Sequence, residues 1–246
     1  MDQQKHYKLI ACAVLYRECY CCASISKNII DLIILEQGLH DIGEKKMSGR
    51  LQEEIDNAEP EKYDAILLGY GLCNLGIKGL NSRIPLVIPR AHDCITLLMG
   101  SKERYLEYFN ENPGTFYQSV GWMERAKDHL SNPESTTTLM GMKTYQEYVE
   151  KYGEENAKYI MDTLGGGLKN YSKLSYIDTN VVSFISLKDE QKKIASDEGW
   201  EYEELKGSTD LLLSIMNGEW EESNFLVVKP GCSVEPSYDL SIVKSI

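Results

Sequence analysis

Two short apolar segments in the first half of the chain constrain its fold more than any other feature. They cover residues 65–68 and 85–88, and neither contains a polar side chain. Segments this short and this apolar are typical of strands buried on both faces of a parallel sheet, because helices cover such a sheet on either side. The sequence therefore predicts an α/β fold built around these two strands.

Further apolar segments alternate with amphipathic ones along the rest of the chain. This alternation predicts parallel strands joined by helical crossovers. The other expected strands are 8–15, 29–35, 116–120, 174–177, 201–205 and 225–228, and the expected helices include 17–27, 44–58, 94–110, 187–198 and 209–217. We therefore expect a mainly parallel α/β structure with helices on both faces.

The order strand–helix–strand–helix–strand occurs twice, first near residues 8, 29 and 64 and again near residues 174, 200 and 225. The third strand of each set ends in a similar way, with LLGYGLC in one and VVKPGC in the other. A diverged duplication would explain this similarity. We expect two similar α/β lobes, an N-terminal one of residues 1–114 and a C-terminal one of residues 115–246, packed as one compact unit.

Charge and hydropathy exclude several kinds of partner and location. The formal net charge of −12 leaves no basic face for nucleic acid or an anionic membrane surface. The N-terminal residues lack the apolar core of a signal peptide, and no segment approaches the roughly 18 apolar residues of a membrane span. We expect a cytoplasmic protein whose partners are small molecules or proteins. Seven cysteines, an odd number, do not suit a disulfide framework there.

Reactive side chains follow the two central strands where each one ends. Cys73 comes after Gly69 and Gly71, whose backbones can turn sharply or approach a ligand closely. The second strand is followed by Arg90, His92, Asp93 and Cys94. In open α/β sheets, ligands bind at the carboxyl ends of the strands, where neighbouring loops converge. We therefore expect the ends of strands 8–15, 64–69 and 85–89 to line one cleft, which also places Cys12 there.

Cys94 is expected in the first turn of a helix, with Asp93 as its N-cap. A helix N-terminus lowers the pKa of a thiol and favours the thiolate, which is the form that binds metal or attacks carbon. The sequence therefore predicts a metal centre with Cys73, Cys94 and His92 as ligands. Thiolates and imidazole suit zinc, iron or an iron–sulfur cluster.

The remaining candidates have supporting roles. Arg90, His92 and Asp93 are expected to take part in catalysis by orienting the site or a substrate anion, although Arg90 could instead pair with a buried carboxylate. Gly69, Gly71 and Cys12 are expected to contact the cofactor. Other residues weighed for the site are Cys19, Cys21, Cys22, Cys232 and His40. The first three point in different directions on a helix and are expected to be structural.

The segments LEQGLHD, YDAILLGYGLC, PRAHDCITLLMGS and GWMER resemble an uncharacterised family, domain-of-unknown-function family 1638. Its members are most alike at the positions of Cys73, Arg90, His92, Asp93 and Cys94. The family occurs in anaerobes, often in gene neighbourhoods of corrinoid-dependent methyl transfer. The resemblance therefore implies a role in one-carbon metabolism, with a corrinoid, a corrinoid protein or a methyltransferase as partner.

Three functions remain open from the sequence. The leading one is a metal-binding enzyme or accessory factor of corrinoid-linked methyl metabolism. The second is a metal-free enzyme in which Cys94 is the nucleophile and His92 or His40 the base. The third is a binding module that holds a cofactor at its glycine-rich strand ends without catalysing a reaction.

Overall fold

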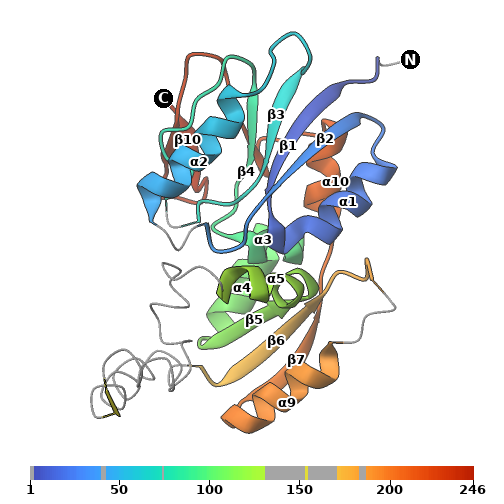
Figure 1. Ribbon diagram of the computed structural model, residues 1–246, viewed down its shortest axis with the longest axis vertical. Coiled ribbons are helices and arrows are strands. Elements are labelled where there is room, and N and C mark those ends of the chain that lie inside the picture. Colours follow the sequence, from blue (N-terminus) through green and yellow to red (C-terminus); the bar gives the residue numbers. More distant parts are fainter. Residues whose placement is uncertain (1–2, 40–42, 74, 131–152, 155–170, 183–186) are drawn as a thin grey trace.

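The computed structural model describes residues 3–39, 43–73, 75–130, 153–154, 171–182 and 187–246 (Figure 1). Its largest sheet has five strands in the order β2-β1-β3-β4-β8. The first four are parallel to their neighbours, and β8 is antiparallel to β4. These strands are β1 (His6–Cys12), β2 (Ile29–Leu35), β3 (Ala65–Gly69), β4 (Leu86–Pro89) and β8 (Phe225–Val228).

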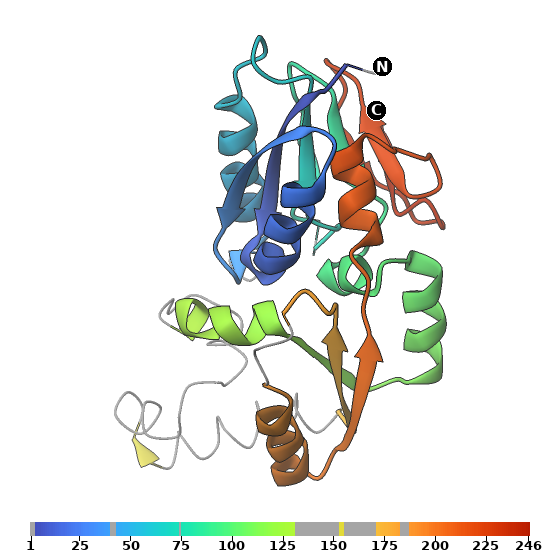
Figure 2. The same cartoon turned by 90° about the vertical axis from the view of Figure 1, so that its right-hand side faces the viewer.

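The two apolar segments at residues 65–68 and 85–88 form β3 and β4, which both lie inside this sheet. All residues of β3 and β4 are buried, as predicted for strands covered on both faces. Helices α1 (Tyr16–Ile25) and α10 (Asp210–Asn217) lie on one face and α2 (Glu44–Asp56) on the other (Figures 1 and 2). The side chains of β1 alternate accordingly: the Tyr7 ring contacts Trp220, just after α10, whereas Lys8 donates to a carbonyl of α2.

A second, three-stranded parallel sheet has the order β5-β6-β7. The Tyr108 hydroxyl of α4 is 2.7 Å from Ser175 Oγ of β6 and donates to Glu203 of β7 at 2.6 Å, which holds α4 against this sheet. The α/β class and the parallel sheets are therefore as the sequence predicts. The elements are β5 (Thr115–Ser119), β6 (Lys173–Asp178), β7 (Glu201–Lys206), α4 (Lys102–Glu111) and α9 (Lys188–Glu198), and a hairpin of β9 (Val234–Pro236) and β10 (Val243–Ser245) follows later.

The chain returns to the first sheet after β7, which divides the expected C-terminal lobe. Residue 115 does begin the second sheet, but α10 packs on the first sheet and β8 pairs with β4 of that sheet. Because β8 is also antiparallel, it is not the counterpart of β3 that a duplication would require. The similarity of the two strand-end sequences therefore does not reflect equivalent positions.

The carboxyl ends of the two parallel sheets face each other across the middle of the molecule (Figure 2). The turn η1 (Ala13–Leu15) after β1 contacts the start of α5 (Val120–Leu130), which follows β5 directly. After β7, the Ser208 N–H donates to the Leu98 carbonyl of α3 (Cys94–Met99) at 2.9 Å. In α/β proteins, ligands bind at the carboxyl ends of the parallel strands.

Within the part of the chain that the structure describes, no helix is both long enough and apolar enough to span a membrane.

Candidate functional site

Backbone hydrogen bonds join the loops that follow β3 and β4. The Leu72 N–H donates to the Ala91 carbonyl at 2.8 Å, and the Cys73 N–H donates to the His92 carbonyl at 2.9 Å. These two bonds fix the Cys73 loop beside the segment that leads into α3. Cys73 itself has a φ of 43°, in the left-handed region that non-glycine residues seldom occupy. Strained backbone of this kind is concentrated at functional sites.

Gly69 and Gly71 allow neighbouring segments of the chain to approach each other closely. A Cβ atom on Gly69 would lie 2.6 Å from the Ala11 Cβ, and one on Gly71 would lie 2.6 Å from the Asp93 backbone nitrogen. Neither residue has positive φ, so what they supply is space. That space is filled by Ala11 and Asp93, and the expected role of both glycines in cofactor binding stays a prediction.

Cys12, Cys73 and Cys94 gather at the ends of three neighbouring strands. Cys12 is the last residue of β1, Cys73 lies in the loop after β3, and Cys94 is the first residue of the helix after β4. Neighbouring strands are about 4.8 Å apart, so side chains from three consecutive strand ends can meet within about 10 Å. Cys12 is buried, and Cys73 and Cys94 are half-buried. We call these three residues the thiol cluster.

The members of the thiol cluster influence one another's ionisation. Burial raises the pKa of Cys73, and negative charge on Cys12 and Asp93 raises it further. Burial also raises the pKa of Cys94 well above its usual value, followed by the charges of Asp93, Cys12 and Cys73, while a contact with the Trp122 indole lowers it. The prediction that the helix start lowers the pKa of Cys94 is therefore wrong for the protein without metal. The helix α3 has only six residues, and its capping group is itself an anion.

Asp93 caps α3, as predicted. Its Oδ1 atom accepts hydrogen bonds from the backbone N–H groups of Ile95 and Thr96 at 3.0 and 3.2 Å, and its Oδ2 atom accepts one from the Tyr105 hydroxyl at 3.1 Å. These three bonds hold the carboxylate in place at the start of the helix. Asp93 thus positions Cys94, and a role in catalysis remains a prediction.

His92 lies next to the thiol cluster in the chain, but its side chain is exposed. Its carbonyl is the group that anchors Cys73. The other imidazole considered for this site, His40, lies outside the described residues. The structure therefore brings three thiols together, and the histidine expected as a metal ligand faces solvent.

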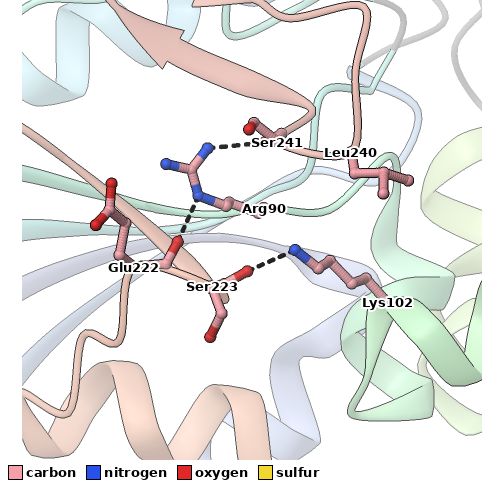
Figure 3. A pocket seen from close by; sticks show the side chains of 6 residues that line it. All are labelled: Arg90, Lys102, Glu222, Ser223, Leu240 and Ser241. Atoms are coloured by element: carbon pink, nitrogen blue, oxygen red, sulfur yellow. Dashed lines mark hydrogen bonds between the residues drawn. The ribbon is translucent and has the colours of Figure 1, made fainter.

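Arg90 binds the C-terminal part of the chain (Figure 3). Its guanidinium donates to the backbone carbonyls of Glu222 at 2.8 Å, Ser241 at 2.8 Å and Val243 at 2.6 Å. One expectation for Arg90 was an ion pair with a buried carboxylate. The structure shows backbone carbonyls as its hydrogen-bond partners instead. A shallow pocket of about 340 Å³ lies beside it, where Lys102 donates to the Ser223 carbonyl. Backbone carbonyls accept hydrogen bonds from both cations. Arg90 and Lys102 therefore fasten the C-terminal segment to the rest of the fold, which is a structural role.

The other cysteines lie outside the thiol cluster, although negative charge on Cys12 also raises the pKa of Cys19. Cys19 and Cys22 of α1 are fully buried, whereas Cys21 is half-exposed. Cys232 was weighed as a strand-end candidate, but it follows β8, which runs antiparallel to β4. The carboxyl end of β8 lies beside the amino end of β4, so Cys232 is at the opposite edge of the sheet.

Glu18 is a buried acid in this region that the sequence does not reveal. Its side chain is only 1% exposed, and its Oε1 atom accepts a hydrogen bond from Thr179, just after β6, at 2.7 Å. Its Oε2 atom has no hydrogen-bond partner among the described residues. Burial raises the pKa of Glu18, against the opposing effect of the Thr179 hydroxyl. The carboxyl therefore links the two sets of strand ends in a largely desolvated position.

Replacing Glu18 by glutamine should change how stability depends on pH. Because folding raises the pKa of Glu18, the folded state holds this proton more tightly than the unfolded state, whose glutamate has a pKa of about 4.3. The wild-type protein should therefore lose stability as pH rises from that value through the raised one, and Glu18→Gln should not show this loss. Urea denaturation at several pH values measures the difference, with exposed Glu103→Gln as the control. Parallel pH profiles for Glu18→Gln and wild type would contradict the assignment.

No group of three or more His, Cys, Asp or Glu side chains among the described residues is already arranged around a point that could hold a metal ion. The thiol cluster is thus a set of neighbouring side chains whose sulfur atoms do not yet converge.

Comparison with known proteins identifies the family but no characterised relative. No curated protein and no solved structure shows significant similarity to the chain. A family model described as "Protein of unknown function (DUF1638)" matches residues 34–216 of the 246. The match includes the loops that carry Cys73 and Cys94 and all of the second sheet. The chain therefore belongs to the DUF1638 family.

Proposed function

We propose that this protein binds a soft transition-metal ion, zinc or iron, through Cys12, Cys73 and Cys94. The observation that carries the proposal is the placement of three cysteines at the carboxyl ends of the neighbouring strands β1, β3 and β4. Sulfur ligands favour zinc, copper(I) and iron–sulfur clusters over magnesium or calcium. This ligand set differs from the one predicted from the sequence, because Cys12 takes the place of the exposed His92.

The electrostatics favour metal binding over a metal-free cysteine nucleophile. An activated cysteine needs a nearby cation or base that lowers its pKa. None of the described groups that shift the pKa of Cys73 or Cys94 is a cation, and burial raises both pKa values. A divalent metal ion supplies the missing positive charge, because it binds the thiolates and displaces their protons. A buried thiol cluster of this kind is therefore better suited to a metal than to direct attack on a substrate.

Three thiolate ligands leave a fourth position for a substrate or a cofactor. Zinc bound in this way would activate a thiol or a water molecule there. An iron–sulfur cluster held by three cysteines would have one iron atom open to substrate. The half-buried positions of Cys73 and Cys94 suit such access. A purely structural zinc site instead has four protein ligands and no open position.

We place this chemistry in corrinoid-linked methyl or one-carbon metabolism, as an enzyme or as an accessory factor. The support for this context is the resemblance of the chain to a family found near genes of corrinoid-dependent methyl transfer. A corrinoid protein or a methyltransferase would then be the partner. Zinc would hold a substrate thiol as the thiolate, with release of its proton, and the methyl group would pass from the corrinoid to this sulfur, leaving a methyl thioether and cob(I)alamin. Addition of methylcobalamin and a small thiol to the zinc-loaded protein tests this step, because loss of the methyl group changes the corrinoid absorption spectrum.

Metal analysis of protein purified without oxygen tests the proposal directly. We expect about one zinc ion per chain, or several iron atoms with acid-labile sulfide if a cluster is bound. Zinc added to the metal-free protein in weakly buffered solution should release about three protons per ion, because the three thiols are neutral before binding. Binding should accordingly tighten as pH rises. Protein that neither contains metal nor takes it up would contradict the proposal. Such a result would favour a metal-free binding module instead.

A further inference from the structure

Strand β2 ends the five-stranded sheet, with α1 packed beside it (Figure 1), and no described strand pairs with its outer side. The Ile29 N–H donates to the Lys5 carbonyl, on the side of β1. Backbone groups alternate in direction along a strand, so the N–H and C=O groups of Ile30, Leu32 and Ile34 point away from β1. An edge of this kind offers a row of hydrogen-bonding groups to another strand.

The side chains along this edge are apolar and partly exposed. Ile29 is 47% exposed, and Ile25, at the end of α1, is 64% exposed. Proteins usually protect such an edge with an outward-pointing charge or a proline. The one charged residue of β2 is Asp31, which accepts a hydrogen bond from Tyr63 at 2.8 Å and pairs with Lys62 at 2.6 Å. Both partners immediately precede β3, which lies beyond β1, so Asp31 is held back across the sheet and does not guard the edge.

Opposite charges flank β2. Lys27 lies just before its amino end and Glu36 directly after its carboxyl end, and both are exposed. Antiparallel pairing of two copies of β2 would bring each Lys27 near the partner's Glu36, whereas parallel pairing would bring like charges together. The ion pair that Lys27 forms with Glu219 within the chain is exposed on both sides and therefore weak enough to exchange. The edge is thus complementary to a second copy of itself, in a chain whose net charge of −12 otherwise opposes self-association.

We propose that β2 is a dimer interface, at which two copies of the chain pair their β2 strands antiparallel about a two-fold axis at Leu32. The outward-pointing residues then face one another, with Ile30 opposite the partner's Ile34 and Leu32 opposite the partner's Leu32. Aliphatic cross-strand pairs of this kind stabilise an antiparallel ladder. A two-fold interface uses the same surface on both copies and is the commonest arrangement in homo-oligomers. The pairing joins the two five-stranded sheets into one.

Charge reversal at the two ends of β2 tests this pairing without changing the core. Glu36→Lys should weaken the dimer about tenfold, because symmetry makes the change twice and each attraction becomes a repulsion. Lys27→Glu should have a similar effect, and the double variant should recover most of the wild-type affinity, since its charges are exchanged and not lost. Sedimentation equilibrium at low ionic strength measures the dissociation constants. Glu103→Lys makes the same change of net charge at an exposed position of α4 and is the matched control.

Leu32→Pro tests the backbone part of the interface. The Leu32 N–H points outward, so proline removes a donor to the partner strand and leaves the ladder between β1 and β2 complete. This variant should be monomeric where wild type is dimeric, with circular dichroism showing that its fold is kept; if it does not fold, the charge-reversal variants decide. A wild-type protein that is monomeric at all concentrations would overturn the inference. So would a dimer that Glu36→Lys weakens no more than Glu103→Lys does. The test needs no metal and is independent of the proposed function.

Discussion

Replacing Cys73 and Cys94 together by serine should reduce metal content from about one ion per chain to nearly none and leave the fold intact. A serine hydroxyl is similar in size to a thiol, but it binds zinc and iron poorly. Each single variant, including Cys12→Ser, should weaken binding by more than about 100-fold, because loss of a ligand exceeds the effect of losing an outer-shell contact. Elemental analysis and competition with a chromophoric chelator measure these changes.

Two cysteines outside the thiol cluster serve as controls. Cys21 is half-exposed on α1, and Cys232 lies at the opposite edge of the sheet. Their serine variants should keep the metal content of wild type. Circular dichroism and urea denaturation of Cys73→Ser with Cys94→Ser establish whether the fold is preserved. A folded double variant that retains its full metal content would show that the cysteines only fill the core.

The proximity of the loops that carry Cys73 and Cys94 could be predicted because parallel strands impose it. Two wholly apolar strands must lie within one sheet, and their carboxyl ends then share an edge. The glycines and cysteines directly after the strands therefore had to meet there, which placed Cys73 and Cys94 together. The N-cap role of Asp93 followed from the same local pattern.

The features that could not be predicted depend on how distant segments pack. The four residues of β8 are apolar, but their periodicity does not give the strand's direction or its neighbour. In the sequence, Glu18 looks like an ordinary acid in the first turn of a helix. Its burial depends on the loop after β6, where Thr179 donates a hydrogen bond to it. Arg90 follows the central strand as a ligand would, yet its partners are carbonyls about 130–150 positions further along the chain. Burial likewise reversed the expected ionisation of Cys94, because a helix start carries no information about desolvation.

The contact between the two sets of strand ends should be sensitive to a single methyl group. Gly121 is the second residue of α5, and a Cβ atom added there would lie 1.8 Å from the carbonyl oxygen of Val14 and 2.6 Å from its carbonyl carbon. Both atoms belong to backbone, so no side chain can move aside. Gly121→Ala should therefore lower the free energy of unfolding by about 1–3 kcal/mol or more. Urea denaturation followed by circular dichroism measures this loss.

A second glycine provides a matched control for this substitution. Gly49 lies within α2, and a Cβ atom there would have no neighbour within 4 Å. Gly49→Ala should raise stability by about 0.5–1 kcal/mol, because alanine favours a helix interior over glycine. The same change should thus have opposite signs at the two positions. Val14 lies two residues after Cys12, so Gly121→Ala should also weaken metal binding, whereas Gly49→Ala should not. Equal stability of the two variants would mean that α5 does not pack on the turn after β1.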